Sequence, residues 1–198
     1  MTFLLRILFF VSSALLPQIA LAHSPIKGIG YFLNGMLHPL LVPSQVITII
    51  ALGLLYGQHT ADKNKKSVLI FLMAIIAGLA YTGIFVTPGV SILLLVIATL
   101  IGLIIISGLT LPQAVYIVLA VVVGCIVGFD SAQVDLDTKS TIVSLFGSGV
   151  GIYFLFLYSM ALSESLTRKK WQIIAVRIIA SWLCASAIMV LALSFSQS

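Results

Sequence analysis

The side chains that could bind a metal ion or carry a proton are few in this sequence. Its 198 residues include three histidines, five acidic residues and two cysteines. His38 is the best single candidate for a metal or proton contact, because it lies in an apolar segment and a neutral imidazole binds nickel, copper or zinc. The alternative is a structural histidine that is hydrogen-bonded within the protein.

Asp130 is a second candidate ligand. It ends an apolar segment and is followed by Ser131. A carboxylate at such a boundary attracts cations from the aqueous phase and is a hard metal ligand. The alternative is a solvated helix terminus, and the sequence favours neither interpretation over the other.

Asn34 and Gln45 are related to His38 by helical angle. At about 100° per residue, both lie within about 40° of His38 and on the same side of it. If the helix continues through Pro39 and Pro43, the three side chains form one polar stripe. Because polar groups are costly in lipid, this stripe is expected to face the interior of a helical bundle.

The composition indicates what kind of structure must position these residues. Hydrophobic residues make up 61% of the chain and charged residues 8%, compared with roughly 25% charged in a soluble domain. The mean hydropathy is +1.26. These values exclude a soluble globular enzyme, a disordered tail and a secreted disulfide scaffold. They predict an all-α, polytopic integral membrane protein.

The first 22 residues have the pattern of a signal peptide. A basic start containing Arg6 precedes an apolar stretch at residues 7–16, and residues 20–22 read Ala-Leu-Ala, an A-x-A cleavage pattern. Cleavage there leaves residues 23–198 as a single transmembrane helical-bundle domain that begins outside the cytoplasm. The alternative is an uncleaved anchor helix.

Cleavage after residue 22 would make His23 the new N-terminus. A free α-amine and the ring nitrogen of the same residue can chelate one divalent ion. Two nitrogens form only half of a metal site, so an accidental N-terminal histidine is an equal alternative.

Apolar runs long enough to cross a bilayer of about 30 Å predict about six transmembrane helices. A shorter apolar piece, residues 27–39, precedes them and is interrupted by Pro39 and Pro43. It is either a re-entrant or interfacial helix or the kinked outer half of the first span. The six expected spans are residues 41–57, 67–86, 90–109, 112–129, 141–162 and 171–195.

The charges between the spans predict the orientation. The connections at 59–66 and 163–170 each carry three basic residues, whereas 130–139 carries three aspartates. By the positive-inside rule both basic connections are cytoplasmic. The expected location is therefore a bacterial inner membrane, with a periplasmic mature N-terminus.

Pairs of glycines four residues apart are expected to mark close helix packing, since small residues let helix backbones approach. The alternative role is to leave room for a permeation path. The pairs are Gly53 and Gly57, Gly124 and Gly128, and Gly147 and Gly151.

No catalytic motif is present, so no enzymatic activity and no tightly bound cofactor are expected. Cys125 and Cys184 lie in apolar runs and predict free thiols. The sequence has no basic face with interleaved aromatic residues, so nucleic-acid binding is not expected. The expected partners are the lipid bilayer and either further copies of the chain or a larger membrane complex.

The stretch from Gly28 to Leu41, GIGYFLNGMLHPLL, resembles the opening of the HupE/UreJ family, and segments 51–58 and 127–131 resemble its second branch. The family motif reads H-P-x-x-G-x-D-H. Here His38 and Pro39 match, whereas Val42, Ser44 and Gln45 replace the glycine, the aspartate and the second histidine.

The resemblance implies a small membrane protein with about six spans, linked to nickel or cobalt supply. From the resemblance, His38 carries over as a metal contact and Ser44 and Gln45 as positions that line the same path. Together with the residue chemistry above, the expected transient contacts of a divalent metal are His23, His38 and Asp130, and Asn34 joins Ser44 and Gln45 along the path. The function expected is a secondary permease or facilitator for nickel or cobalt. The degenerate motif leaves an alternative, a non-transporting accessory subunit of a larger membrane complex.

Overall fold

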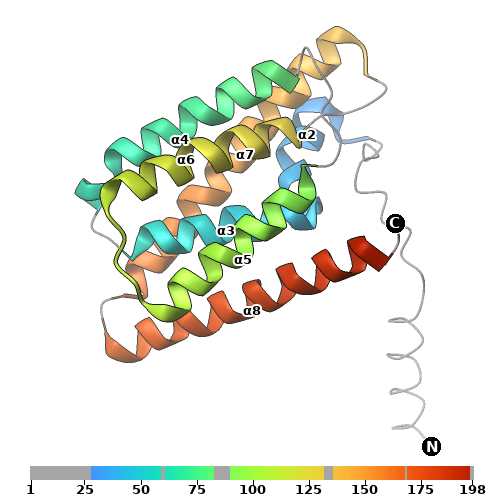
Figure 1. The fold of residues 1–198 in the computed structure, drawn as a ribbon. Helices are drawn as coiled ribbons and strands as arrows, with labels where there is room; N and C mark the ends of the chain where they lie inside the picture. The colour runs from blue at the N-terminus through green and yellow to red at the C-terminus, as the bar shows by residue number, and fades with distance from the viewer. Residues whose placement is uncertain (1–27, 59–60, 83–89, 132–135, 168, 197–198) are drawn as a thin grey trace, which may run out of the picture.

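The computed structural model describes residues 28–58, 61–82, 90–131, 136–167 and 169–196. The predicted signal peptide and His23 lie outside these residues. Within the described part the chain is entirely helical (Figure 1). The helices are α2 (Gly30–Leu41), α3 (Pro43–Gly57), α4 (Ala61–Thr82), α5 (Ser91–Ser107), α6 (Gln113–Phe129), α7 (Thr138–Ser165) and α8 (Lys170–Ser196).

The centre of the bundle is α3, of which twelve of fifteen residues are buried. It packs mainly against α7 on one side and α5 on the other. Around it the remaining helices form pairs, α4 with α6, α2 with α7 and α5 with α8 (Figure 1). A helix that is apolar on all sides is stable only when it is surrounded in this way or lies in lipid.

Each predicted span corresponds to one helix from α3 to α8. Three helical segments, Lys65–Thr82, α7 and α8, are long and apolar enough to cross a membrane, and α2 with α3 would make a fourth as one broken span. Helices α5 and α6 are apolar and 17 residues long, or about 26 Å, which is the lower end of the usual range. The structure confirms an α-helical membrane fold.

One predicted connection is partly helical. Residues 59–66 were expected to be a loop, but α4 already begins at Ala61 and carries Lys65 and Lys66 in its first turns. Lysine is a good helix former, and its long side chain can extend from a helix end to water. The length of the apolar run therefore predicted the membrane-crossing part of α4. It did not predict the polar residues at the start of the helix.

The helix breaks at Val42, between α2 and α3. Val42 has extended backbone angles (φ −96°, ψ 108°) and the two helices meet at 75°. Pro43 is the first residue of α3, and a residue before proline is disfavoured in the helical region. Pro39 lies inside α2 and does not end it. The condition for a continuous stripe of Asn34, His38 and Gln45 is therefore not met, because helical angles do not carry across the break.

All six glycines of the predicted pairs lie at contacts between helices. A methyl group on Gly53 would lie 2.6 Å from Ser159 Cβ and 2.8 Å from the Phe156 carbonyl oxygen of α7. One on Gly124 would lie 2.7 Å from Ala74 Cβ of α4. Gly57 likewise faces α7, Gly128 faces α4, and Gly147 and Gly151 face α2.

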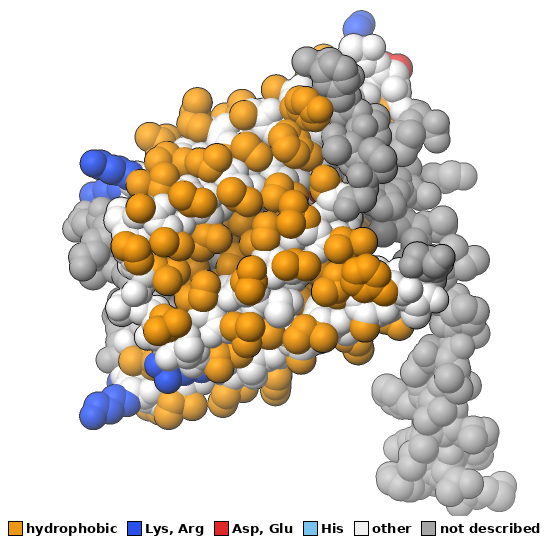
Figure 2. Space-filling view, viewed as in Figure 1, with side chains coloured by type: hydrophobic (Ala, Val, Ile, Leu, Met, Phe, Trp, Pro, Cys, Tyr) orange, Lys and Arg blue, Asp and Glu red, His pale blue; other side chains and the backbone are white. Residues whose placement is uncertain are grey.

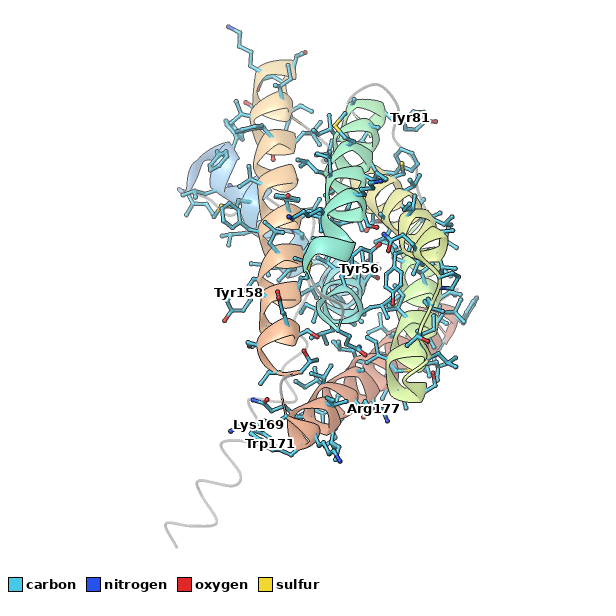
Figure 3. All side chains as sticks on the ribbon, turned by 90° about the vertical axis from the view of Figure 1, so that its left-hand side faces the viewer. Tyr56, Tyr81, Tyr158, Lys169, Trp171 and Arg177 are labelled. Atoms are coloured by element: carbon cyan, nitrogen blue, oxygen red, sulfur yellow. The ribbon has the colours of Figure 1, made fainter. Side chains whose placement is uncertain are left out.

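Four aromatic rings from four helices fill the interior near the start of α6. The rings of Tyr56 and Tyr116 are 5.3 Å apart, those of Tyr56 and Phe156 5.5 Å, and those of Phe71 and Phe156 4.5 Å. The Tyr56 hydroxyl donates a hydrogen bond to the Tyr116 carbonyl oxygen. Figure 3 shows Tyr56 inside the bundle, whereas Tyr158 points away from it. Since a buried phenol needs an acceptor, this bond fixes α3 against α6.

The charged residues gather at the two ends of an apolar surface. Figure 2 shows hydrophobic side chains across the visible face and basic ones along the edge where α4 and α8 begin. Lys66 and Lys170, from the two basic connections, thus lie at the same end of the bundle, called here the basic end. Asp137 and Lys139, at the start of α7, lie at the opposite end.

Candidate functional site

The Asp130 carboxylate joins three helices at the end opposite to the basic end. Asp130 follows α6, and its Oδ1 accepts a hydrogen bond from the Ser91 hydroxyl of α5 at 2.7 Å. Its Oδ2 accepts from Ser44 Oγ at 3.4 Å and from Gln45 Nε2 at 3.0 Å, both in α3. The same Nε2 also donates to the Asp130 carbonyl oxygen at 3.0 Å. These four residues are called the Asp130 cluster.

Local sequence places the cluster at the beginnings of two helices. Ser91 is the first residue of α5, and Ser44 and Gln45 follow the Pro43 with which α3 begins. Helix N-termini carry partial positive charge and stabilise a nearby carboxylate. Hydrogen bonds to an ionised carboxylate are also stronger than neutral ones. The Asp130 side chain is therefore held in a defined position, half-buried between α3, α5 and α6.

Gln45 gives the cluster an additional ligand atom. Its side chain is fully buried, and its Oε1 has no hydrogen-bond partner among the residues that the structure describes. Buried polar atoms are seldom left in this state, because the loss of hydration is not compensated. An amide oxygen next to a carboxylate and two hydroxyl groups is a set of oxygen ligands that can hold a cation.

Further hydroxyl groups anchor the helices around the cluster. Thr48 Oγ1 donates to the carbonyl oxygen of Ser44 at 2.6 Å and to that of Leu94, in α5, at 3.0 Å. Thr82 Oγ1 donates to the carbonyl oxygens of Gly128 and Phe129 at 3.0 and 3.1 Å, which ties the end of α4 to the end of α6. These hydrogen bonds join the helices that carry the cluster, and so they help to keep its oxygen atoms in place.

His38 lies on the other side of the break from the cluster. It is in the last turn of α2 and is 4% exposed. Its carbonyl oxygen accepts a hydrogen bond from the N–H of Val42 at 3.2 Å. Val42 is the residue at which the chain turns between α2 and α3. The two candidate ligands thus lie near the same break. His38 precedes it in α2, and Asp130, which follows α6, contacts the first residues of α3 after it.

Asn34 is one turn further from the break. It is half-buried, and its Nδ2 donates to the Gly30 carbonyl oxygen of its own helix at 3.1 Å. The structure therefore brings together Ser44, Gln45 and Asp130, but it does not place Asn34 in the cluster. Within the described ranges, no three His, Cys, Asp or Glu side chains come close enough to share a metal ion.

Ser91 is the cluster member that sequence reasoning missed. A signal for it was present, because serine often precedes or begins a helix, and Ser91 follows a Pro-Gly pair before an apolar run. What the sequence did not show is that this helix start lies beside Asp130, 39 residues further along the chain.

These features define an α-helical membrane protein with an oxygen-rich polar site beside a broken helix. A family model described as HupE / UreJ protein matches residues 11–192. The chain therefore belongs to the HupE/UreJ family. A search of curated proteins and a search of solved structures each found no match.

Proposed function

We propose that the chain is a secondary facilitator for divalent metal ions across a bacterial inner membrane, with nickel or cobalt as the ion that the family resemblance implies. The observation that supports it best is the Asp130 cluster, which presents a carboxylate and a buried amide oxygen at one end of the bundle. By the positive-inside rule, the basic end faces the cytoplasm. The cluster and the N-terminal residues then face the periplasm.

In this proposal Asp130 attracts the hydrated ion, and Gln45 Oε1 with the hydroxyl groups of Ser44 and Ser91 replaces part of its water. Ser44 and Gln45 are neutral where the family motif has an aspartate and a histidine, so they bind weakly. Weak, successive contacts favour release and conduction, whereas a tight site would retain the ion. His38, at the break, is the next contact and the only nitrogen ligand that we assign within the described residues.

The decisive experiment compares D130N with D137N in cells or proteoliposomes supplied with radioactive nickel or cobalt. Both variants lose one carboxylate from the same end of the bundle, but the exposed Asp137 lies outside the cluster. We expect uptake to fall roughly ten-fold or more in D130N, because loss of a metal-site group has at least that effect. D137N should transport normally.

His38→Ala tests the second contact. Uptake should fall in this variant while its amount in the membrane stays normal. Unchanged uptake in both D130N and H38A, at normal protein levels, would rule out this path.

The alternative function, a non-transporting accessory subunit, is favoured by one observation. An apolar groove of about 430 Å³ opens between α2 and α7, and its walls include Leu40, Phe154 and Tyr158, which are 48%, 68% and 71% exposed. Metal flux through liposomes that contain only this purified chain distinguishes the two functions. A facilitator carries metal alone, whereas an accessory subunit does not.

A further inference from the structure

A guanidinium group lies at the basic end without an ionic partner. Arg177 is exposed on α8, seven residues after Lys170, and it forms no ion pair or hydrogen bond with any residue that the structure describes. Glu164, exposed near the end of α7, is not paired with it either. Charged groups at membrane level usually find a counter-charge or reach the lipid headgroups, so Arg177 needs a partner.

The end of α5 does not supply that partner. The Arg177 guanidinium lies against Gly108, where a methyl group would overlap its Nη2 atom. The Gly108 N–H donates to the carbonyl oxygens of Ile104 and Ile105, both at 3.2 Å, and Ser107 Oγ donates to Ile104 at 2.9 Å. The carbonyl oxygens of Ile104 and Ile105 are therefore satisfied within α5, and none of the hydrogen bonds given for this helix end comes from Arg177. The donors of the guanidinium remain available to an external acceptor.

An apolar groove begins beside the same glycine. It has a volume of about 580 Å³ and runs along α5 from Leu109 toward the middle of the membrane. From Leu100 to Ser107, the last residue of α5, the helix rises about 10 Å. Three leucines of the groove are more than half exposed. The lining residues are Leu100, Leu103, Ile104, Ile106, Ser107 and Leu109.

The start of α8 marks the level of the membrane surface. Lys169, Lys170 and Trp171 are exposed there, and tryptophan concentrates at membrane interfaces (Figure 3). Arg177 lies about 10 Å further along α8, in the region from which a long side chain still reaches the headgroups. The groove continues from that level into the apolar layer.

We propose that Arg177 and the α5 groove form a binding site for an anionic phospholipid. The guanidinium would bind the phosphate through paired hydrogen bonds, and one acyl chain would lie along Leu109, Leu103 and Leu100. Lys169 and Lys170 would add attraction for a headgroup with a net negative charge. This site is at the opposite end of the bundle from the Asp130 cluster, and the proposal does not depend on metal transport.

The experiment measures lipid retention by the purified full-length protein in detergent, using native mass spectrometry with phosphatidylglycerol and phosphatidylethanolamine. We compare R177Q with K139Q, which removes one exposed positive charge from the opposite end. Retained phosphatidylglycerol should fall about five-fold in R177Q, the effect typical of one basic residue near anionic lipid. It should not change in K139Q. Phosphatidylethanolamine retention should change less than phosphatidylglycerol retention.

Two more variants keep the proposal testable if R177Q folds poorly. R177K keeps the charge but loses the planar pair of donors, so it should retain an intermediate amount of lipid. L103W fills the groove and should reduce retention while Arg177 is intact. Equal retention in wild type, R177Q and L103W would overturn the proposal. Unchanged retention in L103W together with full displacement of the lipid by millimolar inorganic phosphate would also overturn it, because the site would then recognise phosphate without the acyl chain.

Discussion

At the scale of single residues, the Asp130 carboxylate places a negative charge beside the two neutral motif positions Ser44 and Gln45. The family motif places an aspartate and a histidine where Ser44 and Gln45 stand. In the structure the Asp130 carboxylate lies within hydrogen-bond distance of both side chains. A negative charge is thus present beside these positions, but it comes from α6 and not from α3. This explains how a degenerate motif can still form a polar site.

Ser44→Asp should make the folding of the protein depend on metal. The new carboxylate would lie next to Asp130, since Ser44 Oγ is already 3.4 Å from Oδ2. Two carboxylates this close together repel each other unless a cation or a proton lies between them. We expect a lower thermal unfolding temperature in chelator and recovery with nickel or cobalt. The double variant S44D/D130N should show little metal dependence, and a similar dependence in both proteins would contradict the explanation.

Ser91→Ala should weaken the link between α5 and α6. It removes the 2.7 Å hydrogen bond to Asp130, at an expected cost of about 1 kcal/mol in the free energy of unfolding. Ser165→Ala is a matched control, because that exposed hydroxyl only bonds the Leu162 carbonyl of its own helix. Unfolding curves in mixed detergent measure both. Equal stability of the two variants would show that the Ser91 bond has no net effect.

At the scale of helices, close backbone contact organises the bundle. Glycine pairs bring α3 against α7, α6 against α4 and α7 against α2. In lipid there is little hydrophobic gain from joining two helices, so van der Waals packing of this kind supplies much of the attraction. The break at Val42 adds a second effect, because it turns α2 by 75° relative to α3 and exposes the polar start of α3 to the end of α6.

Gly53→Ala should destabilise the bundle, whereas Gly149→Ala should not. The added methyl group at Gly53 would meet Ser159 Cβ at 2.6 Å and the Phe156 carbonyl oxygen at 2.8 Å, neither of which can move freely. At Gly149 it would meet the flexible end of Leu79 at 2.9 Å and Ile75 Cγ2 at an ordinary contact distance of 4.0 Å. Overpacking of this kind costs about 1–3 kcal/mol. Thermal unfolding in detergent compares the two, and a larger loss for G149A would contradict the packing seen here.

At the scale of the whole molecule, polar chemistry is confined to the two ends of an apolar bundle. One end has the Asp130 cluster, and the other has the basic residues with Arg177 and the α5 groove. The aromatic rings around Tyr56 fill the interior nearer the basic end. Packed rings thus lie between the Asp130 cluster and the basic end. The facilitator proposed above would need these rings to move to let an ion pass.

Cysteine labelling should show both basic connections on one side of the membrane. In a chain with Cys125 and Cys184 replaced by alanine, K66C and K170C should react with a membrane-impermeant maleimide only after the cytoplasmic face is opened. K139C should react in intact spheroplasts. This follows from the positions of the three residues at opposite ends of the bundle. If K66C and K170C were labelled from different faces, the starts of α4 and α8 could not lie on the same side of the membrane, which would contradict the arrangement of helices in this fold.

The sequence by itself determined the helices and the family. A bilayer requires about 20 apolar residues per span and satisfies no backbone hydrogen bonds, so apolar length alone located α3 to α8. The family motif was readable because it is local, from Gly28 to Gln45. The sequence also marked both Pro39 and Pro43 as interruptions. Pro43 begins α3, because the residue before a proline is restricted by local sterics, whereas Pro39 lies inside α2.

Only the tertiary structure decided the site. Asp130 is 85 residues from Gln45 and 39 from Ser91, and no helical period relates them. The stripe of Asn34, His38 and Gln45 failed for the same reason, because an angle computed along one helix loses its meaning at a 75° bend. The close approach of the Arg177 guanidinium to Gly108 was equally invisible in the sequence. Contacts between helices depend on how the glycine faces pack, and that geometry is a property of the folded bundle, not of any one segment.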